Sequence, residues 1–449
     1  MRELNEPLLR TRNLNYKKFA LKANPFPISG LTAEHTPYPL IDRAMDDEIH
    51  NFIDDTLRGQ EYGGLVILGD FGSGKTYALR YVETLLRTIV TRPDAEEILA
   101  IYVEKPPRTV LGLIADVCNR IGRVRIKNFL REMILADLAN EVLKDKQEKS
   151  DRIFSLRAAL RGKKSTGLFE FQLSELVTPN AVMNPAATFD LLRQSGFDPT
   201  VLLGFGAESL RLILKPKDSR TLDIATHLAE FALADDKEAL RLWNQFLLGR
   251  VWSGGQLIAS VSGQAVWMHL LILLRRAGYK MIYWLVDEFE ELDYHHQKEP
   301  EVRAFLSEFR DLIDANIRGF GLVLASKVSA WDICKRLNPA FAQRFSRIVL
   351  LPPNTFEDLR RLIEVRLKAV REKDYSGNPL SPFTDAAIQA LEKVSLGNTR
   401  VAVEACHVLL WHVASTSDQS IEVKTVHNLN NINRAYFYAR EGTVADAGG

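Results

Sequence analysis

The amino-acid sequence predicts an α/β fold: a parallel sheet carrying a P-loop and sandwiched by helices, with a helical insertion and a C-terminal helical lid. Three observations lead to this prediction. An apolar run at 65–68 ends in the pattern Gly-x-x-x-x-Gly-Lys-Thr at 69–76, apolar and amphipathic segments alternate after it, and a second apolar run at 281–286 ends in Asp287 and Glu288. Alternation of strands and helices is typical of a parallel sheet covered by helices.

The glycine-rich loop has the residue types that a bound triphosphate requires. Its glycines let successive backbone N–H groups turn toward phosphate oxygens as the next helix begins. Lys75 can reach the β- and γ-phosphates, and the hydroxyl of Thr76 can bind Mg²⁺. The predicted nucleotide-binding residues of the loop are Gly69, Asp70, Phe71, Gly72, Ser73, Gly74, Lys75 and Thr76.

The elements on either side of a long central stretch follow from periodicity and from proline or glycine breaks. Before it we expect helices at 44–57, 78–90 and 109–121 and a strand at 98–104. After it we expect strands at 281–286, 320–325 and 347–351 with a helix at 302–317, and then lid helices at 355–372, 385–394 and 399–414. Thr355 and Asp358 form a capping pair for the first lid helix.

Six segments are expected. They are an N-terminal lead-in at 1–62, the first part of the ATPase core at 63–122, a helical insertion at 123–260, the second part of the core at 261–353, the helical lid at 354–416 and a C-terminal tail at 417–449. The insertion is inferred because the strands at 98–104 and 281–286 are too far apart for one compact connection. Its first part is rich in Lys and Arg, which is typical either of solvated helix faces or of a surface for nucleic acid or a partner.

Composition places the chain among ordinary globular proteins of two or three domains, with 449 residues, 46% hydrophobic and 26% charged. The net charge of +1 gives no global argument for nucleic acid. Three separated cysteines argue against a disulfide framework and against structural zinc, so a cytoplasmic location is expected. The N-terminus has no apolar core of a signal peptide, and the longest apolar stretch, near 265–274, is too short to cross a bilayer, so no membrane role is expected.

The two carboxylates after the strand at 281–286 complement the P-loop. Mg²⁺ prefers oxygen ligands, and a carboxylate at a strand end beside the loop can hold it directly or through water, a role assigned to Asp287. Glu288 leaves the strand in the opposite direction and is assigned as the base that polarises the attacking water. Glu290 and Glu291 are expected to be solvated.

Three further polar residues are candidates for contacts with the nucleotide. Ser326, at the end of the next strand, either contacts the γ-phosphate or the attacking water, or is a turn residue. Arg344 either reaches a neighbouring subunit's γ-phosphate or is a surface residue. Arg400 falls in the first turn of a helix, where a cation opposes the helix dipole, and either binds a phosphate or lies incidentally at the surface.

Taken in order, the loop at 69–76, Asp287 with Glu288, Ser326, Arg344 and the turn at 397–400 resemble the motifs of AAA+ ATPases. More narrowly, they resemble the origin-recognition-like branch, which includes replication initiators, transposition-accessory ATPases and related ATPases of mobile elements and defence loci. The resemblance covers about residues 20 to 122 and 262 to 416 and implies ATP, Mg²⁺ and a homo-oligomer in which each site is completed by its neighbour. Initiators of this branch usually add a C-terminal winged helix, for which the residues after Ala414 are too few.

Two functions are compatible with this set of residues. The first is an ATP-hydrolysing oligomeric switch that engages double-stranded DNA and recruits or regulates a partner protein. The alternative is a slowly hydrolysing, nucleotide-bound scaffold whose helical insertion binds a protein partner. A P-loop kinase fits less well, because Arg400 and the acid pair are typical of hydrolysis.

Overall fold

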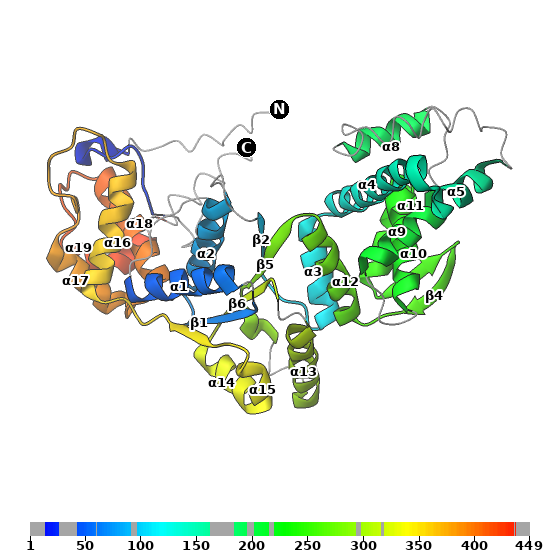
Figure 1. Cartoon of the computed structure of the whole chain (residues 1–449). Helices are drawn as coiled ribbons and strands as arrows, with labels where there is room; N and C mark the ends of the chain where they lie inside the picture. The colour runs from blue at the N-terminus through cyan, green and yellow to red at the C-terminus, as the bar shows by residue number, and fades with distance from the viewer. Residues whose placement is uncertain are drawn as a thin grey trace, which may run out of the picture.

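A parallel sheet lies at the centre of the chain in a computed structural model (Figure 1). The structure describes residues 14–26, 43–59, 61–90, 97–161, 184–194, 202–214, 220–292, 298–315, 318–434 and 436. Within these residues the sheet has five strands in the order β2-β5-β6-β1-β7. The strands are β1 (Gly63–Leu68), β2 (Glu97–Val103), β5 (Tyr279–Val286), β6 (Phe320–Ser326) and β7 (Arg347–Leu350). The predicted α/β class is confirmed.

The register of the sheet decides which residues share its edge. Leu68 at the end of β1 lies opposite Ser326 at the end of β6, and Val286 at the end of β5 lies opposite Leu324. All of these pairs are parallel, so the carboxyl ends of β1, β6 and β5 meet at one edge. The P-loop and the carboxylate pair both follow strands at this edge.

Helices cover both faces of the sheet because side chains of each strand alternate between them. Leu65 and Ile67 pack on one face with α1 (Arg43–Gly59) and α2 (Lys75–Val90). Val66 and Leu68 belong to the core of the other face. The helices on that side are α3 (Val110–Ile121), α12 (Gly263–Arg276), α13 (Glu299–Ala315), α14 (Val328–Leu337) and α15 (Pro339–Ala342).

The insertion continues the core of this second face instead of forming a separate one. Its elements are α4 (Arg123–Glu148), α5 (Asp151–Arg161), α8 (Pro185–Gln194), α9 (Leu203–Leu214), α10 (Arg220–Leu233), α11 (Asp236–Leu247), β3 (Arg250–Ser253) and β4 (Gln256–Ser260). Their buried apolar residues pack in one cluster with those of α3 and α12. The insertion also contains an antiparallel hairpin of β3 and β4, whereas the sequence predicts a helical insertion.

Two of the basic residues in the Lys- and Arg-rich first part of the insertion are buried in α4. The ammonium group of Lys127 lies 3.1 Å from a carboxylate oxygen of Asp236 on α11, and this contact lowers the pKa of Asp236. Arg131 donates to the carbonyl oxygen of Ala232 at 2.7 Å. Both side chains therefore hold α4 against α10 and α11, and this part of the basic composition is structural.

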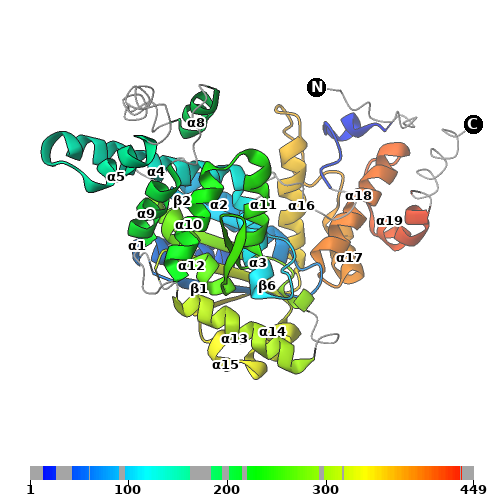
Figure 2. The ribbon, with the colours of Figure 1, turned by 90° about the vertical axis from the view of Figure 1, so that its right-hand side faces the viewer.

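The lid is formed by α16 (Phe356–Val370), α17 (Asp385–Ser395), α18 (Thr399–Ser415) and α19 (Val423–His427), and it lies on the opposite side of the sheet from the insertion (Figure 1). Figure 2 shows α16, α17 and α18 side by side. The predicted capping box of Thr355 and Asp358 is present.

Segments from both ends of the chain complete the lid. Phe19 and Phe26, which belong to the expected lead-in, are buried in its core, as are Ile421 and Tyr436 from the expected tail. The ammonium group of Lys18 donates to three carbonyl oxygens at the end of α18, at 2.6 to 2.8 Å. The lid of the structure therefore extends beyond the boundaries expected from the sequence. None of the helices in the described part of the chain is long and apolar enough to span a membrane.

Candidate nucleotide-binding site

The P-loop adopts a backbone that only glycine takes up readily. Gly72 and Gly74 have φ angles of 79° and 101°, in the left-handed region. The loop begins where the N–H group of Gly69 donates to the carbonyl oxygen of Ser326 at 3.2 Å, which fixes the loop to the end of β6. Gly74 has open space where a Cβ atom would be. This conformation leaves room for an anion against the loop backbone.

Lys75 is the first residue of α2, and its ammonium group is turned back onto the loop. It donates to the carbonyl oxygens of Gly69 at 2.9 Å and Asp70 at 3.2 Å. A carboxylate oxygen of Glu290, in the short helix η3 (Phe289–Leu292), lies 3.6 Å away. Glu290 is thus mostly buried beside the loop, and the expectation that it is solvated is wrong. The side chain of Glu291 lies outside the described residues.

Asp287 is almost completely buried, with 2% exposure, and both of its oxygens accept a hydrogen bond. The hydroxyl of Tyr102 donates to one at 2.8 Å, and the N–H group of Glu288 donates to the other at 2.9 Å. Burial and the neighbouring charge of Asp287 raise the pKa of Tyr102 well above its usual value, so the phenol remains a donor. Tyr102, at the end of β2, is a supporting residue that the sequence motifs do not reveal.

The same tyrosine connects Asp287 to α2. The guanidinium group of Arg80 lies 3.5 Å from the centre of the Tyr102 ring. Arg80 is one helical turn beyond Thr76 and shares its side of α2. Tyr102 and Arg80 therefore link Asp287 to α2, the helix that carries Thr76. That Asp287 and Thr76 hold one metal ion stays a prediction.

Glu288 follows Asp287 in a left-handed conformation, with φ of 48°, and its side chain is exposed. Non-glycine residues in this region are uncommon and concentrate at functional sites. The turn sends the Glu288 side chain away from the packed strand and toward solvent.

Three polar side-chain atoms around the loop are buried without a hydrogen-bond partner in the described structure. They are the hydroxyl oxygens of Ser73 and Ser326 and the second carboxylate oxygen of Glu290. Buried polar groups are almost always paired, so unpaired ones around one loop indicate a place for a ligand. The serine hydroxyls suit a phosphate, which accepts hydrogen bonds, and the site therefore fits a nucleotide.

The residues present also fit Mg²⁺ held partly by that nucleotide. No group of three or more His, Cys, Asp or Glu side chains arranged to hold a metal occurs in the part of the chain that the structure describes. Mg²⁺ in nucleotide sites needs only one or two protein oxygens, because phosphates and waters supply the others. Thr76 and Asp287 are the two side chains that would hold it.

The lid contacts the P-loop through three successive loop carbonyls. The side-chain amide of Asn398 donates to the oxygen of Phe71 at 2.6 Å, the N–H group of Arg400 donates to Gly72 at 3.2 Å, and the hydroxyl of Thr399 donates to Ser73 at 3.4 Å. We call these contacts the lid–loop clasp.

Arg400 itself lies over the loop. Its guanidinium group is 4.6 Å from the centre of the Phe71 ring, and this ring is largely exposed. Cation–π contacts of this kind are weak at exposed positions, so Arg400 can exchange this contact for a phosphate. The structure thus brings Arg400 to the loop, and its contact with a phosphate stays a prediction.

Arg344 lies at the opposite edge of the sheet from the loop. Its carbonyl oxygen is 2.5 Å from the place of a Cβ atom on Gly64, near the start of β1. Its guanidinium group donates to both carboxylate oxygens of Asp314, at 2.5 and 2.9 Å. This ion pair raises the pKa of Arg344 and lowers that of Asp314. Arg344 therefore does not contribute to the site of its own subunit.

Comparisons with known proteins give a similarity at the level of overall structure. No protein-family model matches the chain, and no curated protein matches it in sequence. A structure of the Aeropyrum pernix ORC2 protein in ADPNP–ADP complexes aligns at 11% identity and a TM-score of 0.43, covering 90% of this chain and 71% of its own. Cdc6p from Pyrobaculum aerophilum aligns at 12% identity and a TM-score of 0.38, covering 86% and 65%.

Both alignments have TM-scores below 0.5, so the assignment of the site depends on its own contacts.

The lid–loop clasp predicts a specific role for Asn398. Asn398→Ala removes both the bond to Phe71 and the cap of α18, where its oxygen accepts from the N–H group of Val401 at 3.2 Å. Asn398→Ser keeps an oxygen that can cap α18 but is too short to reach the carbonyl oxygen of Phe71. This variant therefore tests the contact with the loop separately from the helix cap. We expect faster hydrogen–deuterium exchange at 69–76 in both variants. At 399–402, the start of α18, exchange should become faster only in Asn398→Ala. Unchanged exchange at 69–76 in both would contradict the clasp.

Proposed function

We propose that this protein binds and hydrolyses ATP with Mg²⁺ and uses the nucleotide to switch its assembly, engaging double-stranded DNA and a partner protein in the process. The observation that carries this proposal is the set of unpaired buried hydroxyls around a P-loop that shares a sheet edge with Asp287. Bound Mg·ATP supplies the reactive γ-phosphoryl group and the charge of the metal.

Each residue of the site has a task in this proposal. The loop N–H groups and Lys75 bind the phosphates, while Thr76 and Asp287 hold the metal. Glu288 accepts the proton of the attacking water. Ser326, whose hydroxyl has no partner among the described residues, donates to the γ-phosphate or to the water. Arg400 on the lid binds the γ-phosphate, and Arg344 stabilises transition-state charge in the neighbouring subunit's site.

The arrangement explains how hydrolysis would change the structure. Arg400 belongs to the lid, Lys75 to the core, and Arg344 faces away toward a second subunit. A γ-phosphate bound by all three connects lid, core and neighbour, and its loss removes that connection. Subunit arrangement then depends on the nucleotide.

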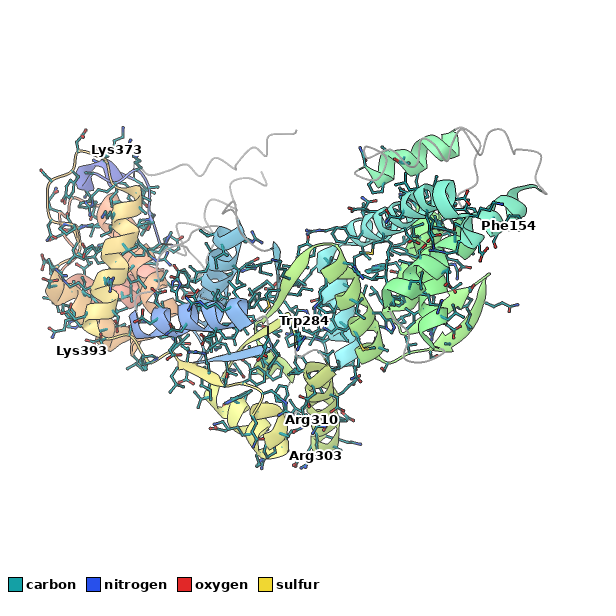
Figure 3. All side chains as sticks on the ribbon, in the orientation of Figure 1. Phe154, Trp284, Arg303, Arg310, Lys373 and Lys393 are labelled. Atoms are coloured by element: carbon teal, nitrogen blue, oxygen red, sulfur yellow. The ribbon has the colours of Figure 1, made fainter. Side chains whose placement is uncertain are left out.

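The insertion is the proposed surface for the protein partner. More than half of the exposed large apolar side chains among the described residues belong to the helices and strands of the insertion or to the short loops between them. They are Val124, Leu143, Phe154, Leu212, Leu222, Leu240, Leu248, Leu257 and Ile258. Phe154 lies at the end farthest from the sheet (Figure 3). The insertion also shares the core of the sheet domain, so a partner bound there is held rigidly to the ATPase.

Arg275 and Arg318 are the proposed contact for a DNA phosphate. The guanidinium group of Arg275 packs over Gly319, beside Arg318, and neither arginine forms an ion pair with a carboxylate among the described residues. Burial and the charge of Arg318 lower the pKa of Arg275, which is the direction expected for a cation without a counter-ion. A backbone phosphate would supply that counter-ion.

Two substitutions at the nucleotide site have distinguishable outcomes. Lys75→Ala should abolish ATP binding, because it removes the cation of the phosphate site. Glu288→Gln should keep ATP binding and lower turnover by about 10²–10⁴-fold, the usual contribution of a general base. Fluorescent-nucleotide titration and phosphate release measure the two effects. Turnover in Glu288→Gln equal to that of the unmodified protein would remove Glu288 from its role.

Arg344→Ala should lower turnover without lowering ATP affinity, since the residue is remote from its own loop. Mixing this variant with Lys75→Ala, which keeps Arg344, should restore phosphate release at mixed interfaces. Asp314→Asn is the control for the ion pair: it removes the carboxylate and leaves the guanidinium available. If Asp314→Asn is as inactive as Arg344→Ala and mixing restores nothing, the ion pair is structural and the site is completed within one subunit.

Duplex DNA should accelerate phosphate release and promote assembly seen by electron microscopy with ATP. Arg275→Ala should reduce this stimulation and its salt dependence, because a phosphate contact is lost. Arg303→Ala is the matched control, since Arg303 is exposed on α13 (Figure 3) and lies 3.5 Å from Glu299. ATP binding without turnover, with or without DNA, would favour the scaffold function instead.

A further inference from the structure

Glu290 differs from Asp287 and Glu288, the acidic residues that precede it after β5. Its side chain is 14% exposed, and its nearest charged neighbour is Lys75, whose side chain is 9% exposed. Glu288, two residues earlier, points to solvent, and both oxygens of Asp287 are occupied by hydrogen bonds. Glu290 is thus the carboxylate that faces the ammonium group of the P-loop lysine.

The ammonium group of Lys75 makes two hydrogen bonds and one ion pair. A lysine has three N–H donors. Two are directed to the carbonyl oxygens of Gly69 and Asp70, whereas the carboxylate oxygen of Glu290, at 3.6 Å, lies beyond hydrogen-bond distance and contacts the ammonium group through charge. A phosphate that binds Lys75 therefore approaches the same ammonium group as Glu290.

Glu290 is the partner that a phosphate replaces most readily. Its contact with Lys75 is longer than either carbonyl contact, and its second oxygen is buried without a hydrogen-bond partner. A phosphate also carries the same sign of charge as Glu290, so the two anions repel each other in a poorly solvated site. Binding of the nucleotide and the contact of Lys75 with Glu290 therefore oppose each other.

We propose that Glu290 is an internal counter-anion that competes with the terminal phosphates of the nucleotide for Lys75. This inference rests on the proposed function, because it assumes that the loop binds a nucleoside polyphosphate. Glu290 weakens the binding of polyphosphates, and the effect grows with the negative charge of the phosphate chain. It also stabilises the site between turnovers, when Lys75 would otherwise be a buried cation without a carboxylate.

Glu290→Gln tests the competition, because it removes the charge and keeps the size of the side chain. We expect Mg·ATP to bind about tenfold more tightly, ADP to gain about threefold and AMP to be unchanged, since the repulsion scales with charge. Isothermal titration of each nucleotide, at low and high salt, gives the dissociation constants. The matched control is Glu104→Gln, which removes an exposed charge just beyond β2 at the same edge and should alter affinity by less than about twofold.

Glu290→Asp separates direct contact from charge, and serves if the glutamine variant does not fold. It keeps the charge on a shorter side chain, so the contact with Lys75 is lost while most of the repulsion remains, and we expect a smaller gain for ATP. Weaker or unchanged ATP binding in Glu290→Gln would overturn the inference while leaving the proposed function in place. If neither the unmodified protein nor any Glu290 variant binds a nucleotide, the proposed function fails and the inference fails with it.

Discussion

The parallel pairing of β1 with β6, and of β6 with β5, is the constraint on which the site depends. It places the ends of three strands at one edge, so the loop after β1, the serine at the end of β6 and the aspartate after β5 become neighbours. The hydrogen bond from Gly69 to Ser326 joins the loop to this edge. A shift of either pair by one residue would turn the alternating side chains to the wrong face and move these groups apart.

Around this edge, the charged groups of the site balance one another. Lys75 is held by two carbonyl oxygens and Glu290, and Asp287 by Tyr102 and the backbone of Glu288. Buried charges that keep hydrogen-bond partners are far less unfavourable than isolated ones. In the proposed function, a nucleotide that binds to this site competes with Glu290 for the ammonium group of Lys75.

The lid adds a second connection, made with backbone atoms of the loop. The N–H groups of a P-loop turn inward to a phosphate, so its carbonyl oxygens point outward, and Asn398, Thr399 and Arg400 bind three of them. Any change in the loop that accompanies phosphate binding alters these carbonyls and thereby the lid. Because Phe19 and Phe26 are part of the lid core, the N-terminal segment that carries them is packed into the lid.

The sequence by itself determined the local elements and the chemistry of single motifs. The P-loop, the capping box of Thr355 and the strand ending at Val286 each depend on residues close together in the chain, and their positions follow from periodicity and turn chemistry. The strand ends differ from the expected ones by only a few residues. The sheet class followed as well, because alternating strands and helices allow few other arrangements.

Only the tertiary structure decided which of these residues meet. The contact of Glu290 with Lys75, the support of Asp287 by Tyr102, the clasp of Asn398 and the placement of Arg344 at the far edge all join segments distant in the sequence. Four of the five residues at 287–291 are acidic, and the sequence gives no sign that Glu290 turns inward, because that depends on a left-handed turn at Glu288 and on the packing of Phe289. Local patterns specify elements, whereas long-range packing specifies the neighbours of each side chain, and in this protein the second decides the electrostatics of the site.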